Sequence, residues 1–312
     1  MIKILELFGG IGSPRIALRN IGIPVKSIDY VEIDEKAVRS YNAMFKKELE
    51  YKTQSVVNWN LKPDILIHGS PCQDFSIAGK QKGASPGSET RSSLMWETIK
   101  IIEQMGRWKP KYVIWENVKN VLSKHMVCNF NTYLKQMEKM GYSNSFKVLD
   151  ARDFGLPQAR QRVFTISILN EDPFDFDLLE KKEMQDIKGF LSSYEDRHIV
   201  KQPSMLNLIN NTSNSTFNGR VSVIDKYAYT ITTKQMRSPN SGVIQIDDDS
   251  YRYLTELECW RLQGYDDNDF FAAEQVHASR INCLNGALYK QAGNSIPVTV
   301  LESIFKVITK NI

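Results

Sequence analysis

Short runs of β-branched and other apolar residues alternate with amphipathic stretches over the first 170 residues or so. The runs predict strands. The stretches between them, where apolar residues recur every three or four positions, predict helices. We expect strands over residues 2–7, 25–33, 64–69, 112–117, 146–151 and 162–168, and helices over residues 35–47, 93–105 and 129–140. This alternation is typical of an α/β fold with a parallel sheet covered by helices.

The pattern weakens beyond about residue 170. Residues 203–219 are rich in Asn, Ser and Thr, and only short strand signals such as VSVI and AYTIT interrupt the loops. A second, loop-rich domain is therefore expected. Near the end of the chain Ile296, Val300, Ile304 and Ile308 recur at helical spacing and predict an amphipathic helix that Ser295 opens.

Composition narrows the class of protein. The 312 residues are 42% hydrophobic and 24% charged, close to the globular average, which excludes disorder, collagen and coiled coil. The chain has no apolar stretch of membrane-spanning length and no secretory signal at its start, so we expect a cytoplasmic protein. The net charge is +4, yet residues 171–250 hold 9 basic against 13 acidic residues. A general basic surface there is not expected.

The four cysteines lie far apart and form no CxxC pair, so their spacing predicts neither a metal site nor a redox motif. Cys128, Cys259 and Cys283 are each expected to be small buried apolar residues. Cys72 differs, because it lies in GSPCQDFSIAG at the end of a predicted strand, where open α/β sheets bind ligands. Cys72 is therefore the candidate nucleophile. The Gly-, Ser- and Pro-containing stretch after it is expected to be a mobile lid.

The first predicted strand ends in LELFGGIGS, a glycine turn of the kind that lets the backbone approach a ligand closely. Phe8, Gly10 and Gly12 would form its floor. Glu32 follows at the end of the second strand, where a carboxylate can accept hydrogen bonds from the ribose of a nucleoside cofactor. The third glycine of the dinucleotide fingerprint is missing, which favours a cofactor without phosphate.

Five motifs occur in an order that identifies a family. They are PCQ at 71–73, ENV at 116–118, QARQR at 158–162, RYLTELECWRLQGY at 252–265 and QAGNS at 291–295. This set, which spans nearly the whole chain, resembles the cytosine-C5 DNA methyltransferase family. The resemblance implies a Rossmann-like domain that binds S-adenosylmethionine, over residues 1–172 and 284–312. It also implies a smaller target-recognition domain over 173–265, and a hinge over 266–283.

The resemblance also implies a chemistry. Carbon 5 of cytosine is a poor nucleophile, so the Cys72 thiolate would first add to carbon 6. Glu116 would hydrogen-bond to or protonate N3, and its carboxyl should be partly desolvated. Arg162 would bind the cytosine O2, while Arg160 is expected to contact a phosphate or a loop. Asn117 belongs to the same expected catalytic set.

The resemblance also implies which residues of this sequence bind the cofactor. The positions expected to bind S-adenosylmethionine are Phe8, Gly10, Gly12, Glu32, Ser55, Pro71 and Asn294. Ser55 is a departure, because the family usually places an aspartate there to meet the adenine amino group. Ser55, Asn58 or a backbone carbonyl would take over that contact. Asn294 could instead be a helix cap, and no metal is expected.

The expected partner is double-stranded DNA. Because the reacting atoms lie inside the duplex, the target base would rotate out, with residues 76–92 closing over it. The expected DNA contacts are Gln81, Arg91, Thr232, Gln235 and Arg237, with Lys80, Lys82 and Lys234 beside them. Thr255 and Glu258 form a capping box that starts a helix. Arg261 and Gln263 are expected to organise the junction between the domains.

Because the chain is compact, we expect a methyltransferase of the bacterial or phage restriction-modification type. It would act as a monomer in the cytoplasm of a bacterial cell, and a cognate restriction endonuclease would act separately. A tRNA cytosine methyltransferase shares the catalytic set but carries a CFT signature that this chain lacks. A DNA-binding homologue without activity and a Rossmann dehydrogenase are further alternatives. An intact Cys72, Glu116 and Arg162 argues against the former, and the broken glycine fingerprint argues against the latter.

Overall fold

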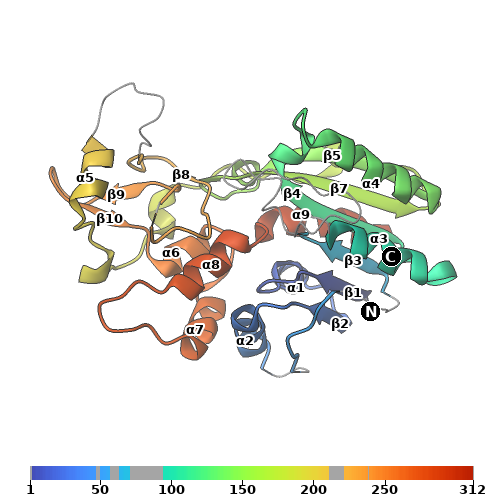
Figure 1. The fold of residues 1–312 in the computed structure, drawn as a ribbon, viewed down its shortest axis with the longest axis horizontal. Helices are drawn as coiled ribbons and strands as arrows, with labels where there is room; N and C mark the ends of the chain where they lie inside the picture. Colours follow the sequence, from blue (N-terminus) through green and yellow to red (C-terminus); the bar gives the residue numbers. More distant parts are fainter. Residues whose placement is uncertain are drawn as a thin grey trace.

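A computed structural model of the chain describes residues 2–46, 50–56, 63–70, 94–210, 221–237 and 239–311. Its centre is a six-stranded sheet in the order β2-β1-β3-β4-β7-β5 (Figure 1). The strands of this sheet are β1 (Ile2–Leu7), β2 (Val25–Val31), β3 (Ile65–His68), β4 (Tyr112–Val118), β5 (Tyr142–Asp150) and β7 (Gln161–Leu169). All six lie where the sequence pattern predicts strands, and the α/β class is confirmed.

The direction of one strand departs from the prediction. Strands β1, β2, β3 and β4 pair in parallel, but β7 runs antiparallel to both of its neighbours, β4 and β5. The expectation of a wholly parallel sheet is therefore wrong. The reason is the short connection between β5 and β7, because a parallel pairing would need a crossover of a dozen residues or more.

Helices cover both faces of the sheet, as alternation along each strand requires. Ile4 and Ile114 contribute to a core with α1 (Ser13–Asn20), α2 (Glu35–Met44) and α9 (Val298–Ile308). Their neighbours Leu5 and Val113 face the opposite way, toward α3 (Met95–Gln104) and α4 (Val127–Lys139). The side chains of successive strand residues thus pack in two separate hydrophobic cores, one on each face of the sheet.

The last helix starts later than predicted. It begins at Val298, after Pro297 at its N-cap position, so Ser295 does not open it. Ser295 instead ends the preceding helix, α8 (Gly286–Asn294), where its hydroxyl donates to the carbonyl of Gln291. Three residues, 295–297, separate the two helices, and Pro297 disfavours a helical conformation for the residue before it.

The region beyond the sheet is built from short elements, as the loop-rich sequence predicts. It contains α5 (Pro203–Asn210), α6 (Glu256–Arg261) and α7 (Asp267–Val276), with α8 leading back to the sheet (Figure 1). Two small strand pairs complete it: β6 (Gln158–Ala159) with β8 (Ala228–Tyr229), and β9 (Val243–Gln245) with β10 (Tyr251–Tyr253). The exact domain boundaries stay a prediction.

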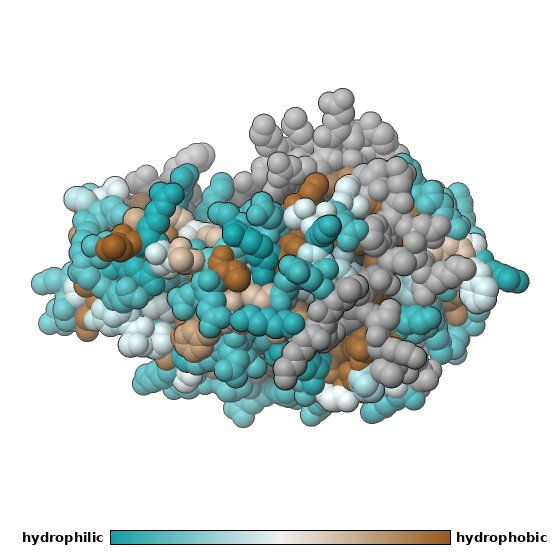
Figure 2. All heavy atoms as spheres, turned by 90° about the horizontal axis from the view of Figure 1, so that it is seen from below, coloured by the Kyte–Doolittle hydropathy of each residue, from teal (hydrophilic) through white to brown (hydrophobic). Residues whose placement is uncertain are grey.

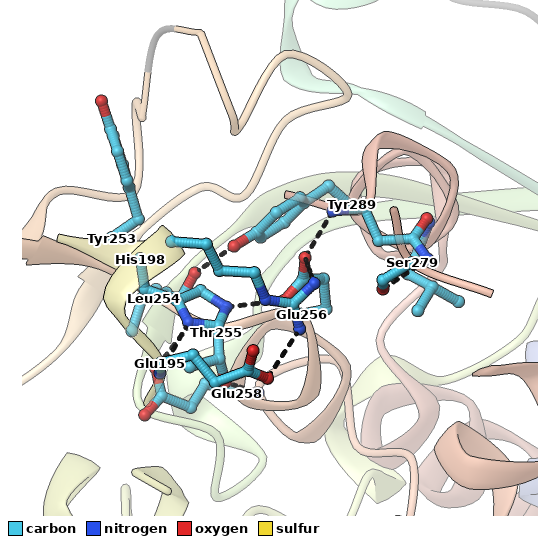
Figure 3. A network of polar contacts seen from close by, with 12 residues as sticks. Glu195, His198, Tyr253, Leu254, Thr255, Glu256, Glu258, Ser279 and Tyr289 are labelled. Atoms are coloured by element: carbon cyan, nitrogen blue, oxygen red, sulfur yellow. Dashed lines mark hydrogen bonds and ion pairs between the residues drawn. The ribbon is translucent and has the colours of Figure 1, made fainter. Parts of the chain in front are cut away.

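A buried polar network fixes the start of α6 (Figure 3). Thr255 and Glu258 form the predicted capping box, and the Glu258 carboxylate also binds both terminal nitrogens of Arg252, at 2.8 and 2.9 Å. The neighbouring Glu256 accepts from His198 Nε2 at 2.9 Å and from the backbone amide of Asn285 at 2.5 Å. Because Asn285 caps α8, this network ties the starts of α6 and α8 together.

The face of the molecule seen from below is mainly hydrophilic (Figure 2). In the view from below, apolar residues form small separate patches among polar ones (Figure 2). Among the described residues, no helix combines the length and the apolar character needed to cross a membrane.

Candidate active site

The turn after β1 brings backbone to the carboxyl edge of the sheet. Phe8 and Gly10 both adopt positive φ, 57° and 55°, which is uncommon for a residue with a side chain such as Phe8. A Cβ added to Gly10 would meet no atom within 4 Å, so this glycine faces open space. The Tyr30 hydroxyl donates to the Gly10 carbonyl at 2.7 Å and holds the turn from below. Phe8 and Gly10 both line a cavity.

Gly12 has a different role from the predicted one. Its φ is 80°, and a Cβ built on it would lie 2.6 Å from the ring of Tyr41. The residue faces α2 rather than the cavity, whose lining does not include it. The expectation that Gly12 forms the cofactor floor is therefore wrong. Gly12 instead lets α1 start close against α2.

Glu32 lies at the rim of the same cavity. Its Oε2 accepts from the Gly10 amide at 2.9 Å, and its Oε1 accepts from the amides of Ile33 and Asp34, each at 2.8 Å. Three backbone donors therefore orient the carboxylate. An ionised carboxylate has about four lone-pair sites, so it can still accept a hydroxyl of a bound ribose.

The cavity has a volume of about 510 Å³, within the range that encloses a nucleoside-sized ligand. Its lining includes the predicted positions Phe8, Gly10, Glu32, Ser55 and Asn294. Apolar lining residues such as Phe8 and Val31, together with the Glu32 carboxylate, suit an adenosine group. The donor set therefore fits S-adenosylmethionine. Glu32 would hold the ribose, and Asn294 of α8 also lines the cavity.

Glu116 and Arg162 meet beside this cavity. Residue 118 of β4 pairs with Arg162 of β7, which makes Glu116 the diagonal neighbour of Arg162 on the same face of the sheet. Arg162 Nε lies 3.2 Å from Glu116 Oε1. Burial raises the pKa of Glu116 above its usual value, although the charges of Arg162 and Arg160 oppose that shift. The predicted desolvation of this carboxyl is confirmed.

Asn117 and Ser70 position the chain just before residue 71. Asn117 is buried, and its amide nitrogen approaches the Ser70 carbonyl at 3.4 Å. The indole of Trp115 donates to the Ser70 hydroxyl at 3.0 Å. Asn117 therefore supports the backbone before residue 71, and it also lines the cavity. The predicted site residues Pro71, Cys72, Gln81 and Arg91, with the expected lid, lie outside the described residues.

Arg160 is a loop contact, which is one of the two roles that the sequence left open for it. Its side chain is buried and donates to the carbonyls of Ile231, Gly293 and Ser295 at 2.8–3.0 Å. A guanidinium held by three carbonyls inside the protein has no face to offer to a phosphate. Its charge still reaches the Glu116 carboxyl.

The predicted DNA contacts of the recognition region divide into two groups. Arg237 is exposed and Thr232 is half-buried, so both can meet a ligand. Gln235 is fully buried and donates from its amide to the Ser241 hydroxyl. The expectation that Gln235 contacts DNA is therefore wrong in this conformation.

Comparison with known proteins decides the family. The family profile described as C-5 cytosine-specific DNA methylase matches residues 2–310, almost the whole chain. The chain belongs to this family. The type II methyltransferase M2.ScrFI of Lactococcus lactis subsp. cremoris is 32% identical to this chain, hereafter the methylase, and the alignment covers 100% of both chains. The orphan methyltransferase M.SssI of Spiroplasma monobiae is 32% identical over 87% of this chain and 73% of its own.

Solved structures agree on the fold. The Dnmt2 methyltransferase of S. pombe superposes with a TM-score of 0.75 at 21% identity, covering 100% of this chain and 99% of its own. The methyltransferase EhMeth of Entamoeba histolytica gives 0.77 at 18% identity, covering 100% and 98%. These structures agree with the fold alone, while the family profile and the curated relatives show that the chain is a DNA (cytosine-5-)-methyltransferase rather than a dehydrogenase. The family uses S-adenosylmethionine.

Two of the three remaining cysteines differ from expectation. Cys259 is buried, as predicted, but Cys128 and Cys283 are exposed. Cys128 lies on the outer side of α4, and Cys283 lies in the loop before α8. The exposure of Cys128 could have been predicted, because it does not share the helical spacing of the buried residues Phe130, Tyr133 and Met137. Among the described residues, no cluster of His, Cys, Asp and Glu could hold a metal ion.

Ile33 and Lys290 line the cavity, although the sequence did not mark either as a site residue. Ile33 follows Glu32 directly and is 74% exposed, so a large apolar side chain lies open beside the carboxylate. Lys290 of α8 forms an ion pair with Asp34 at 2.5 Å, which links α8 to the start of α2 beside the cavity. The signal for Ile33 was an apolar residue within a polar turn. Lys290 carried no local signal, because its partner lies 256 residues away.

Proposed function

We propose that the methylase transfers the methyl group of S-adenosylmethionine to C5 of a flipped-out cytosine in a specific sequence of duplex DNA, with Cys72 as the nucleophile. The observation that carries this proposal is the 3.2 Å approach of Arg162 to Glu116 beside the 510 Å³ cavity. An acid and a guanidinium at one edge of a pocket suit the polar edge of a pyrimidine.

The chemistry assigns each group a task. The Cys72 thiolate adds to C6, and the electron pair displaced from the C5–C6 double bond makes C5 nucleophilic. The buried carboxyl of Glu116 holds a proton at N3, which neutralises the charge that enters the ring. Arg162 donates to O2 and fixes the base. Bound S-adenosylmethionine supplies an electrophilic methyl group. Once C5 carries the methyl group, with S-adenosylhomocysteine as the other product, loss of the C5 proton to a base restores the double bond and releases the thiolate.

The strand ends explain how these groups would meet. Gly69 and Ser70, which follow β3, line the cavity and lead directly into residue 71. A Cβ on Gly69 would lie 3.6 Å from Glu116 Oε2, so the backbone at the end of β3 lies next to this carboxyl. The resemblance assigns Cys72 to the segment that begins there. Glu32 would hold the ribose, while Phe8, Gly10, Ser55, Pro71 and Asn294 would complete the cofactor site.

The biological setting is also part of the proposal. Type II and orphan methyltransferases of bacteria and phages are among the relatives, which supports a restriction-modification role. The methylase would act as a monomer on DNA in the bacterial cytoplasm, and any cognate restriction endonuclease would act separately. Thr232 and Arg237 would contact the DNA, together with Gln81 and Arg91.

Glu116→Gln tests the assigned acid. The substitution keeps the shape of the side chain but removes the proton that it holds at N3. We expect turnover to fall by at least about 100-fold, the usual contribution of a general acid or base, while DNA affinity changes little. Methyl transfer to DNA and DNA binding are measured in parallel, and bisulfite sequencing of plasmid DNA from producing cells identifies the target. Equal losses of turnover and DNA binding would refute the role.

A further inference from the structure

Arg160 joins two segments that the proposed function gives to different ligands. Its Nη1 donates to the Ile231 carbonyl at 2.9 Å, at the start of the recognition loop, which we define as residues 231–233. Its Nη2 donates to the carbonyls of Gly293 and Ser295 at 3.0 and 2.8 Å, at the end of α8. Asn294, between those two carbonyls, lines the cofactor cavity. One buried guanidinium therefore connects the loop to the cavity wall.

A second contact at the same junction is independent of Arg160. A Cβ added to Gly293 would lie 2.4 Å from the carbonyl carbon of Thr232 and 2.5 Å from the amide nitrogen of Thr233. The backbone of the recognition loop therefore packs directly on the last turn of α8. Only glycine leaves room for this packing, because the atoms it meets belong to the main chain.

The other side of the recognition loop is held to the sheet domain. The Gln158 side chain accepts from the Ile231 amide at 3.0 Å and donates to the Leu262 carbonyl at 2.8 Å. The Thr230 hydroxyl donates to the Ala159 carbonyl at 2.7 Å. With both its amide and its carbonyl bound, Ile231 cannot shift without moving its partners. A displacement of the loop is therefore passed to residues 293–295 rather than absorbed locally.

We propose that Arg160 is a positioning residue that couples DNA recognition to cofactor binding. This inference rests on the proposed function, because it needs DNA at the recognition loop and S-adenosylmethionine at the cavity. DNA that orders Thr232 and its neighbours also sets the carbonyls on either side of Asn294, and a cofactor bound against Asn294 sets the loop. By linkage, each ligand then strengthens the binding of the other by the same factor.

The test measures that factor directly. The dissociation constant of S-adenosylhomocysteine is determined with and without duplex DNA carrying the target site, and the ratio of the two values is the coupling. We expect a ratio of about 10 for the unaltered methylase, within the usual range of such effects. In Arg160→Lys, whose ammonium cannot span both segments with a planar fork, the ratio should fall below about 3.

Gly293→Ala provides a second variant that leaves Arg160 in place. Its methyl group pushes the recognition loop away from α8, so the ratio should fall as well. If Arg160→Lys does not fold, Gly293→Ala alone decides. The matched control is Arg261→Lys, because Arg261 also donates to two backbone carbonyls, those of Phe190 and Leu191, but touches neither segment. Its ratio should stay near 10.

The outcomes separate the two proposals. A methylase that binds both ligands with a ratio near 1, or folded variants that keep the full ratio, would overturn the coupling role of Arg160 and leave the proposed function intact. If the unaltered protein binds S-adenosylhomocysteine and DNA but never methylates, the proposed function fails instead. A merely structural role would weaken each affinity without changing their ratio.

Discussion

Glu6 is a buried carboxyl that the proposed chemistry does not use. It lies on β1 directly below the glycine turn and is only 1% exposed, with the Tyr41 hydroxyl donating to it at 2.9 Å. Burial raises the pKa of Glu6 to about 7, although the charge of Arg15 and the Tyr41 hydrogen bond oppose the shift. The folded protein therefore binds this proton more tightly than the unfolded chain does.

Glu6→Gln should change how stability depends on pH. Because the folded pKa is raised, the stabilisation by the Glu6 proton is complete below about pH 4.5 and is lost as pH rises through about 7. Relative to Glu6→Gln, the unaltered protein should lose up to about 3 kcal/mol of unfolding free energy between pH 5 and 8. Urea unfolding at several pH values measures this. Parallel curves for the two proteins would contradict it, and Glu138→Gln on the exposed side of α4 is the control.

Single residues show where sequence reasoning succeeds and where it stops. Glu116 and Arg162 were found because each ends or begins a strand within a recognisable motif, and the antiparallel register brings them together. Gly12 and Gln235 were misplaced because their roles depend on partners elsewhere in the chain. A glycine turn looks the same from the sequence whether its open side meets a ligand or the ring of Tyr41.

Elements were predicted best where a local signal marks their ends. The capping box at Thr255 and Glu258 predicted the start of α6, and alternating apolar runs predicted every strand of the large sheet. The direction of β7 was not predictable from periodicity, because parallel and antiparallel strands share a two-residue repeat. The length of the connection that precedes β7 was the available signal.

Glu258→Gln tests how much the α6 network contributes to stability. Glu258 is fully buried and accepts from Arg252, and also from the backbone amides of Thr255 and Ser192 at 2.8 Å. The substitution leaves the Arg252 cation buried without its counter-charge, so the free energy of unfolding should fall by about 3–5 kcal/mol. Chemical denaturation measures the loss. In the control, Glu97→Gln at the more exposed pair with Lys100, it should be below about 1 kcal/mol. Equal losses at the two sites would contradict the account.

At the scale of the whole molecule, the sheet edge and the region built around α6 and α8 meet at a few buried polar contacts. Motif order along the sequence identified the family, although not every motif lies where the sequence placed it, since QAGNS ends α8 rather than beginning a helix. The contacts that join the two parts were out of reach, since residues such as Arg160 and Gly293 are 133 positions apart. Such pairs become visible only when the chain is folded.

The central claim is that Cys72 forms a transient bond to C6 of the target cytosine, and one trapping measurement tests it most directly. Duplex DNA with 5-fluorocytosine at the target position is incubated with the methylase and S-adenosylmethionine, then analysed under denaturing conditions. Fluorine cannot leave as a proton does, so the adduct should persist as a band of protein joined to DNA. Cys72→Ala should give no such band and no methylation. A Cys72→Ala protein that still methylates DNA would contradict the account.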